Sequence, residues 1–182
     1  MSKKNLIVGQ SGGPTAVINS SLYGVVSEGL RHPEQIQHIY GMVNGIEGFL
    51  AGTVLDFATA FPGSSLEKLK TTPGAYLGSC RYKLPESLED PVYPRLFQKF
   101  REMNIGWFFY IGGNDSMDTV SKLSRYAAQT GSDIRIIGEP KTIDNDLVHT
   151  DHTPGFGSAA RYVASTVREI TIDANVYEKK SV

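Results

Sequence analysis

Cysteine is nearly absent from the sequence, since Cys80 is the only one among 182 residues. A single cysteine excludes an intramolecular disulfide, and such low usage favours a reducing compartment, so we expect a cytoplasmic protein. Long apolar runs are also lacking. The run behind the positive amino terminus spans only residues 6–8, which is too short for a signal peptide or a membrane span, so we expect no membrane association. The formal net charge of −1 argues against a strongly basic surface for binding nucleic acid.

The composition of the chain is that of an ordinary globular domain. Apolar residues make up 40% of the sequence and charged residues 20%, which suits one domain over residues 1–182. Short apolar runs typical of strands alternate with stretches in which apolar residues recur at helical spacing. This alternation predicts a three-layer α/β domain, Rossmann-like, with a mainly parallel sheet and helices on both faces.

The expected elements follow from the apolar pattern of each stretch. We expect buried strands at residues 5–9, 37–43, 107–111 and 134–137, and helices at residues 18–30, 91–104, 117–130 and 157–173. The apolar stripes include Leu30 in the first helix and Ala160, Val163, Ala164, Val167 and Ile170 in the last. We expect a loop at residues 44–48 and a loop-rich region at residues 51–90, with one short helix near residues 66–69. Ser181 and Val182 fit the start of another strand.

A loop with two carboxylates follows the apolar strand at residues 134–137. It contains Lys141, Thr142, Asp144 and Asp146. Open α/β sheets place their chemistry at the carboxyl ends of the strands. One carboxylate can take a proton from a hydroxyl, a second can hold a divalent metal, and a lysine can neutralise a phosphate. Because Asp, Asn and Thr are also common in solvated turns, this loop alone leaves an active site and a plain turn as equal alternatives.

Two other loops join a predicted strand to a predicted helix through paired glycines. Gly12 and Gly13 follow the first strand, and residues 112–116 follow the strand at 107–111. Glycines let the backbone approach a phosphate, and a helix N-terminus attracts an anion. The first loop lacks a Walker lysine and is not a GxGxxG loop, so a structural tight turn remains the alternative there. In the second, Asp115 or Ser116 can cap the helix, and an aspartate beside a phosphate suggests a bridging metal, because like charges repel.

Five stretches of the sequence together resemble the phosphofructokinase family, and in particular its pyrophosphate-dependent branch. They are residues 11–19, 74–81, 112–118, 140–147 and 150–161, of which the motif at 140–146 is highly specific. The resemblance implies reversible glycolytic transfer of a phosphoryl group from pyrophosphate to fructose 6-phosphate, giving fructose 1,6-bisphosphate, with Mg²⁺ as the cofactor. An ATP-dependent 6-phosphofructokinase is the alternative. A non-catalytic anion-binding protein is the alternative from a different class.

The resemblance implies a role for each matching residue. Asp144 is the expected general base, which takes the proton from the C1 hydroxyl of the sugar, and Asp146 is the second active-site carboxylate. Lys141 and Thr142 complete the expected catalytic set, and Thr142, Ile143 and Asp144 are expected to bind the sugar substrate. The expected donor-binding residues are Gly12, Gly13, Arg81, Gly113, Asp115 and Ser116. Arg81, a single loop arginine, can bind phosphate bidentately or be an ordinary surface residue.

The resemblance implies at two positions that the phosphoryl donor is pyrophosphate rather than ATP. Where ATP-using members of the family usually have glycine, this chain has Asp115, which adds bulk and negative charge against the nucleotide's α-phosphate. Lys141 matches the lysine that pyrophosphate users employ to hold their donor. Val43, where ATP users often have an aromatic residue, is weaker support.

The chain departs from the family pattern at Asn114, where the family usually has a metal-binding aspartate. An amide oxygen can still bind a hard cation, but with less charge, so we expect Asn114 and Asp146 to form the metal site. The family's sugar-phosphate site lies largely in a second lobe that the sequence does not contain. We therefore expect the chain to be the donor-binding and catalytic-loop lobe of a longer homo-oligomeric enzyme, with little turnover alone.

Overall fold

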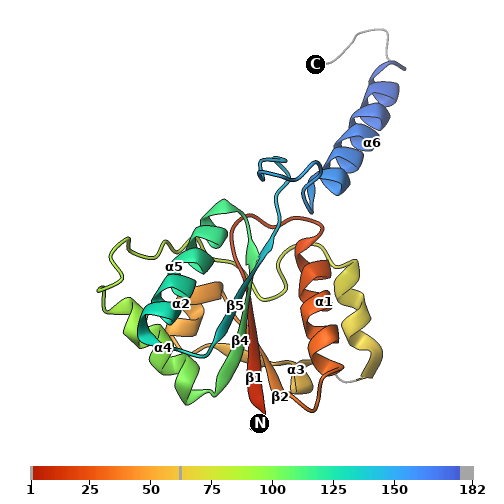
Figure 1. The fold of residues 1–182 in the computed structure, drawn as a ribbon. Helices are drawn as coiled ribbons and strands as arrows, with labels where there is room; N and C mark the ends of the chain where they lie inside the picture. The colour runs from red at the N-terminus through yellow and green to blue at the C-terminus, as the bar shows by residue number, and fades with distance from the viewer. Residues whose placement is uncertain (1, 62, 177–182) are drawn as a thin grey trace.

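A five-stranded sheet forms the centre of the computed structural model, which describes residues 2–61 and 63–176 (Figure 1). The strands lie in the order β3-β2-β1-β4-β5. β1, β2, β4 and β5 run parallel, and β3 pairs antiparallel with β2. Their bounds are β1 Lys4–Gln10, β2 Ile36–Met42, β3 Val54–Asp56, β4 Ile105–Gly112 and β5 Arg135–Pro140. The predicted mainly parallel sheet is confirmed.

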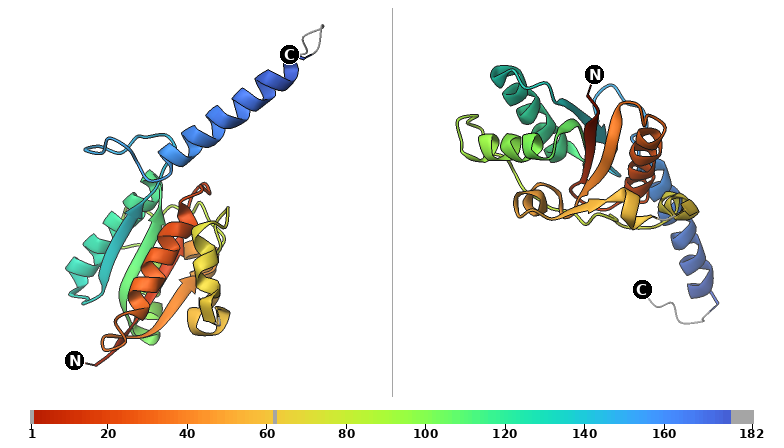
Figure 2. Two further views of the ribbon diagram at one scale, coloured as in Figure 1. Left: turned by 90° about the vertical axis from the view of Figure 1, so that its right-hand side faces the viewer. Right: turned by 90° about the horizontal axis from the view of Figure 1, so that it is seen from below.

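Helices cover both faces of the sheet, which confirms the predicted three layers. α1 (Ile18–Leu30), α3 (Phe57–Ala60) and the 3₁₀ helix η1 (Gly63–Lys70) lie on one face, and α2 (Gly45–Leu50), α4 (Val92–Glu102) and α5 (Asn114–Thr130) on the other (Figures 1 and 2). The α1 core consists of Leu6, Val8, Ile18, Leu22, Val26, Ile39, Phe57, Leu69, Leu77 and Ile111. The α4/α5 core consists of Ile7, Met42, Ile46, Phe49, Leu84, Tyr93, Leu96, Phe97, Phe100, Ile105, Phe108, Tyr110, Leu123, Ala127 and Ile134.

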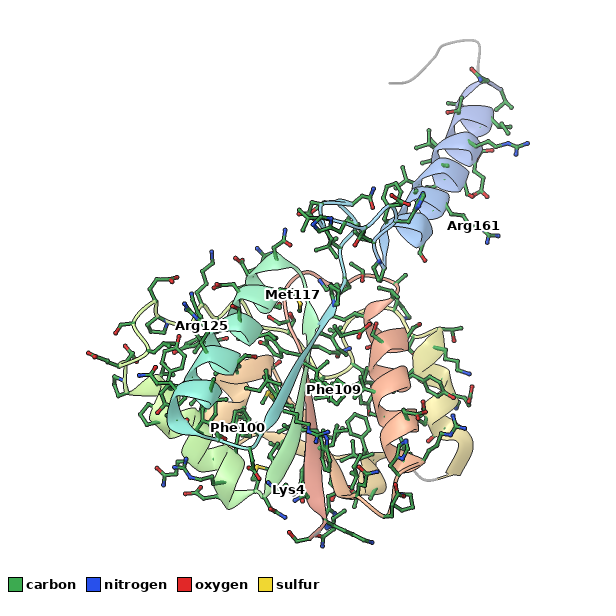
Figure 3. The ribbon with its side chains drawn as sticks, viewed as in Figure 1. Lys4, Phe100, Phe109, Met117, Arg125 and Arg161 are labelled. Carbon is green, nitrogen blue, oxygen red and sulfur yellow. The ribbon has the colours of Figure 1, made fainter. Side chains whose placement is uncertain are left out.

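β4 contributes side chains to both cores. Phe108 and Tyr110 belong to the α4/α5 core, whereas Ile111 belongs to the α1 core and Phe109 packs against it. This follows from the two-residue period of a strand, which sends successive side chains to opposite faces. In Figure 3, Phe109 lies between the sheet and α1, and Phe100 lies in α4 on the opposite face.

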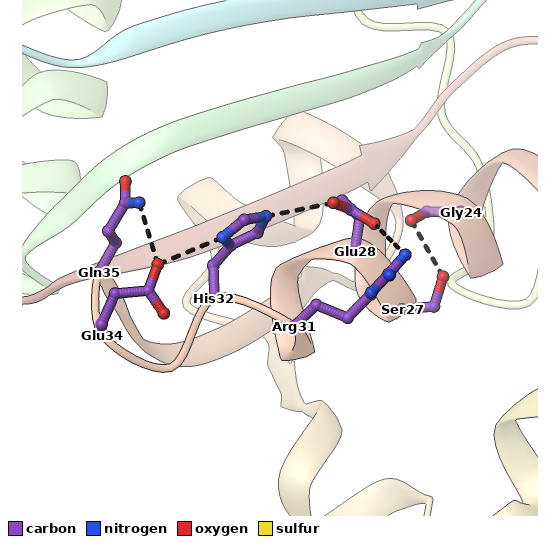
Figure 4. A network of polar contacts seen from close by, with 7 residues as sticks. All are labelled: Gly24, Ser27, Glu28, Arg31, His32, Glu34 and Gln35. Atoms are coloured by element: carbon purple, nitrogen blue, oxygen red, sulfur yellow. Dashed lines mark hydrogen bonds and ion pairs between the residues drawn. The ribbon is translucent and has the colours of Figure 1, made fainter.

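The end of α1 differs from the predicted apolar stripe. Ile18, Leu22 and Val26 are buried as expected, but Leu30 is 57% exposed. Three helical turns take about 11 residues, so the position in line with Ile18 is Gly29, which packs against Ile39. Beyond the helix, His32 lies between Glu28 at 3.1 Å and Glu34 at 3.2 Å in a surface network (Figure 4). Hydrogen bonds to these two carboxylates raise the pKa of His32.

The region around residues 44–60 is more regular than predicted. The expected loop at 44–48 contains most of helix α2, and β3 and α3 were not expected. Asn44 turns the chain with a positive φ of 58°, and Ile46 and Phe49 then bury one face of α2. Gly45 lies too close to Cys80 Sγ and Gln10 O to tolerate a side chain. The glycines that suggest a loop here serve close packing instead.

The predicted burial of the strand at residues 134–137 is wrong, and the apolar stripe of the last helix is exposed. β5 is an edge strand with Ile137 38% exposed, because nothing pairs beyond it among the described residues. α6 (Phe156–Ala174) forms close to its predicted bounds but buries none of its residues, and it extends away from the sheet (Figures 1 and 2). Its expected stripe is exposed, with Val163 and Val167 each at 56%.

The strand expected to begin at Ser181 lies outside the described residues. Within the described ranges, no helix is both long enough and apolar enough to cross a bilayer.

Candidate active site

The loops that follow β1, β4 and β5 meet at one edge of the sheet (Figure 1) and surround a pocket of about 430 Å³. All the residues predicted to act in the site line this pocket. They are Gly12, Gly13, Arg81, Gly113, Asn114, Asp115, Ser116, Lys141, Thr142, Ile143, Asp144 and Asp146. Their convergence follows from the parallel sheet, which brings the carboxyl ends of its strands to the same edge. The placement agrees with the predicted site, and the individual roles remain predictions. Val43 does not line the pocket.

The glycine loop after β1 is fixed by contacts with the segment that contains Cys80. The Gly12 N–H donates to the Cys80 carbonyl at 3.1 Å, and the Ser11 hydroxyl donates to the same oxygen at 3.2 Å. The Gly12 N–H is therefore not available to a ligand. Gly12 instead lets the chain turn with a positive φ of 78° and leaves room in the pocket. Gly13 is exposed at the pocket.

Residues 81–83 form a short span held at both ends. Cys80 is fixed by the glycine loop, and on the other side Lys122 Nζ donates to the Leu84 carbonyl at 3.1 Å. Lys122 is 3% exposed and also pairs with Glu86 at 2.6 Å and with Asp118 at 2.7 Å. The three donors of its ammonium group are thus all used. This arrangement holds Arg81 at the pocket.

Lys141 is buried in the wall of the pocket. Its backbone N–H donates to the Gly112 carbonyl at 2.9 Å, which continues the pairing of β5 with β4. The residue is 4% exposed, and its Nζ donates to the Gly13 carbonyl. Burial lowers the pKa of Lys141, the positive charge of Arg81 lowers it further, and Asp144 opposes the shift. A buried ammonium with a single carbonyl acceptor among the described residues can accept an anionic partner.

The backbone of the loop with the two carboxylates is fixed, while its carboxylates are exposed. Thr142 accepts a hydrogen bond from Asp144 N at 3.0 Å and donates its own N–H to the Pro154 carbonyl at 2.9 Å. Asn145 has a positive φ of 54° and accepts from Thr153 N at 3.0 Å. Within the described part of the chain, the Asp144 carboxylate makes no hydrogen bond or ion pair. Asp144 is therefore free to meet a substrate hydroxyl.

Asn114 and Asp146 converge on one point. Asn114 Nδ2 donates to Asp146 Oδ2 at 2.7 Å, and both residues are exposed at the pocket. No group of three or more His, Cys, Asp or Glu side chains suited to a metal occurs among residues 2–61 and 63–176. Mg²⁺ needs few protein ligands, since it binds through one or two oxygens together with water and substrate phosphates. One carboxylate and one amide oxygen at this point fit such a site, once the amide turns its oxygen toward the cation.

The second glycine loop corrects one prediction. The N-cap of α5 is Gly113, with no side-chain cap, so neither Asp115 nor Ser116 caps the helix. Asp115 instead pairs with Lys83, at 3.2 Å between Nζ and Oδ1. Ser116 is 2% exposed and packs directly under Gly112.

Six lining residues were not among the predicted site residues: Ser11, Pro14, Thr15, Cys80, Tyr82 and Lys83. Lys83 lies two residues after Arg81, and in an extended segment that spacing places two side chains on the same side. This signal is readable in the sequence. Thr15 has a buried hydroxyl with no hydrogen-bond partner in the described part of the chain, and nothing in the local sequence indicates this.

Comparison with known proteins shows which family the chain resembles. The sequence profile described as Phosphofructokinase matches residues 5–182. The chain is 45% identical over 95% of its length to the pyrophosphate–fructose 6-phosphate 1-phosphotransferase of Rhodospirillum rubrum, and it spans 41% of that protein. It is 27% identical over 98% of its length to the ATP-dependent 6-phosphofructokinase of Clostridium acetobutylicum, of which it spans 51%.

A solved structure has the same fold. The pyrophosphate-dependent phosphofructokinase of Marinobacter aquaeolei superimposes with a TM-score of 0.85 and 45% sequence identity, over 93% of this chain and 41% of that one. The chain thus spans about two fifths of the length of these pyrophosphate-dependent relatives. Because the family profile covers nearly all of its residues, the chain belongs to the phosphofructokinase family.

Proposed function

We propose that this chain binds pyrophosphate and provides the catalytic loop for phosphoryl transfer to the C1 hydroxyl of fructose 6-phosphate, giving fructose 1,6-bisphosphate and phosphate. The main observation is that Lys141, a residue only 4% exposed, lies in the same pocket as Asp115. The lysine supplies the charge that a compact diphosphate needs, and the aspartate opposes the further phosphate of a nucleotide. The names of relatives 45% identical to the chain support the same donor and acceptor.

Donor binding depends on the two cations nearest the glycine loop. Arg81 can bind phosphate oxygens bidentately, and Lys141 acts as a point charge. Asn114 and Asp146 would hold Mg²⁺, which supplies further neutralisation of the donor's charge when it is bound. Phosphoryl transfer depends mainly on positioning and electrostatic stabilisation. The fixed backbone of this pocket provides the positioning, and Arg81, Lys141 and the metal would provide the positive charge.

The acceptor side depends on Asp144. Its exposed carboxylate takes the proton from the C1 hydroxyl, while that oxygen forms a bond to the terminal phosphorus of pyrophosphate. The bridging P–O bond breaks, and inorganic phosphate leaves. Thr142 holds the Asp144 backbone through the 3.0 Å hydrogen bond to Asp144 N. Because the chain spans about 41% of the length of its pyrophosphate-dependent relatives, we propose that the remaining sugar contacts come from further sequence in a cytoplasmic homo-oligomer.

Calorimetric titration of the chain with pyrophosphate and then with ATP, both with MgCl₂, tests the donor. We expect pyrophosphate to bind and ATP not to bind. Lys141→Met should remove pyrophosphate binding, whereas Asp144→Asn should keep it, because Asp144 acts on the acceptor. Binding of ATP by the unsubstituted chain would overturn the proposed donor. Equal loss of pyrophosphate binding in both variants would overturn the proposed division of roles.

A further inference from the structure

Two amide side chains are buried at the base of the glycine loop. Gln10 is the last residue of β1, Asn19 is the second residue of α1, and both are fully buried. Gln10 Nε2 donates to Asn19 Oδ1 at 2.9 Å. This bond joins the two ends of the glycine loop, which connects β1 to α1 through residues 11–17 (Figure 1). A buried amide is costly unless its hydrogen bonds are made, so the other partners of this amide pair show what it fixes.

Three further hydrogen bonds join the amide pair to the segment that follows η1. Gln10 Oε1 accepts from Leu77 N at 2.9 Å. Asn19 Oδ1 accepts a second hydrogen bond from Tyr76 N at 2.8 Å. Asn19 Nδ2 donates to the Thr72 carbonyl at 2.9 Å. The amide pair therefore fixes this segment against the end of β1 and the beginning of α1.

The segment fixed by the amide pair continues into the pocket. Leu77 lies three residues before Cys80, whose carbonyl accepts from Gly12 N at 3.1 Å. Arg81 follows and lines the pocket together with Gly12. The amide pair itself does not line the pocket, so it can affect a ligand only through the two segments that it joins.

We propose that Gln10 and Asn19 are positioning residues for the phosphate site, which set the place of Arg81 relative to the glycine loop before a ligand binds. The proposal rests on the proposed donor function of this pocket. A site that is already held in its binding geometry loses less conformational entropy when a ligand binds. A pair with a purely structural role would stabilise the fold in the same way but would leave the pocket unaffected.

Asn19→Ala tests the proposal, with Asn5→Ala as its matched control. Asn5 is also buried, near the other end of β1, where it donates to the Met103 carbonyl at 2.7 Å and accepts from His38 N at 3.1 Å. Both substitutions leave backbone groups without their partners, so each should lower the melting temperature by about 3–10 °C. Asn5 is remote from the pocket lining, so only Asn19→Ala should change the pocket.

Amide hydrogen exchange, followed by NMR, measures the positioning without any ligand. The Gly12 N–H joins the two segments through the Cys80 carbonyl. Asn19→Ala should raise the exchange rate of this N–H about tenfold or more, whereas Asn5→Ala should change it less than about twofold. An equal increase in both variants, or no increase in Asn19→Ala, would overturn the proposal. Gln10→Met keeps the length of the side chain and loses the amide, and it gives the same test if Asn19→Ala does not fold.

Calorimetric titration with pyrophosphate and MgCl₂ tests the consequence for binding. Asn19→Ala should weaken binding about tenfold, and Asn5→Ala less than about twofold. In an Arg81→Met background the effect of Asn19→Ala should fall below about threefold, because the positioned cation is already absent. An equal loss in both backgrounds would overturn the proposal. If the unsubstituted chain does not bind pyrophosphate, the donor function fails, while the exchange rates still decide whether the amide pair positions the loop.

Discussion

Lys141 gives the site a pH dependence whose direction follows from its surroundings. Burial and the charge of Arg81 lower the pKa of Lys141. A bound pyrophosphate favours the ammonium and raises that pKa again. Binding should therefore take up a proton at alkaline pH, and affinity should fall as the pH rises through the lowered pKa of Lys141. Calorimetry in two buffers with different ionisation enthalpies measures this proton uptake.

Two variants isolate the contribution of Lys141. Arg81→Met removes one cation from the pocket, so affinity should drop. Because the charge of Arg81 lowers the pKa of Lys141, the alkaline dependence should remain but move to higher pH. Lys141→Met should remove that part of the dependence and weaken binding roughly 30-fold or more. Protonation of pyrophosphate itself is common to all three proteins, so differences among them report on Lys141. An unchanged proton uptake in Lys141→Met would contradict the assignment.

Substitution of two glycines that have similar φ angles should lower the free energy of unfolding by different amounts. Gly74 has φ 79° and no atom within 4 Å of the place where a Cβ would lie, whereas Gly78 has φ 73° and a Cβ there would overlap Asn44 Oδ1. Gly74→Ala should cost about 1–2 kcal/mol for the left-handed backbone alone. Gly78→Ala should cost more, because the segment leading to Cys80 must also shift. Urea denaturation measures both, and equal costs would show that Asn44 moves aside freely.

At the scale of elements, α6 is a helix whose apolar side chains contribute nothing to the core of the described chain. Val167 is 56% exposed, whereas Val26 of α1 is fully buried. Val26→Ala should destabilise the protein by about 2 kcal/mol. Val167→Ala should leave the free energy of unfolding unchanged within about 0.5 kcal/mol, since alanine also has the higher helix propensity. Thermal melting compares the two, and a similar loss in both would show that α6 packs against a partner in solution.

The sequence predicted those helices and strands whose own residues show a clear apolar pattern or end signal. β4 was predicted because Trp107 to Ile111 is a continuous apolar run, and α5 ends as predicted because Gly131 adopts φ 66° there. β3 was missed because three residues are too few to show alternation. The exposure of β5 depends on strand order, which no single stretch contains. α2 was missed because its glycines are used for close packing, Gly45 against Cys80 and Gly48 against the Val43 carbonyl.

The site was predictable for a different reason. The rule that parallel strands end at one edge brings together Gly12, Asp115 and Asp144 from loops far apart in the sequence. The pair between Lys83 and Asp115 was not predictable, since it depends on the path of an irregular segment. That path is set by the buried Lys122, a contact 38 residues distant in sequence.

At the scale of the whole molecule, the described residues form two cores that are enclosed to different degrees. The α4/α5 core encloses Phe108, which is fully buried. On the other face, a groove between α1 and β4, lined by residues that include Val25, Trp107 and Phe109, leaves Phe109 only partly buried. Phe108→Ala should therefore cost about 3–5 kcal/mol, and Phe109→Ala less than about 2 kcal/mol, because water already reaches part of the Phe109 ring.

Phe108 and Phe109 are adjacent on β4, and both substitutions replace the same side chain with alanine. A difference between the two free energies of unfolding therefore reports the difference in burial. Denaturation in urea gives each free energy of unfolding, and the slope with urea should stay the same if the unfolded state is unchanged. Phe108→Leu serves as the control, since it keeps much of the volume and should cost less than about 1.5 kcal/mol. A loss in Phe109→Ala as large as that in Phe108→Ala would mean that the groove beside α1 is closed in solution. The two faces of the sheet would then be equally packed, contrary to the exposure of Phe109 in the structure.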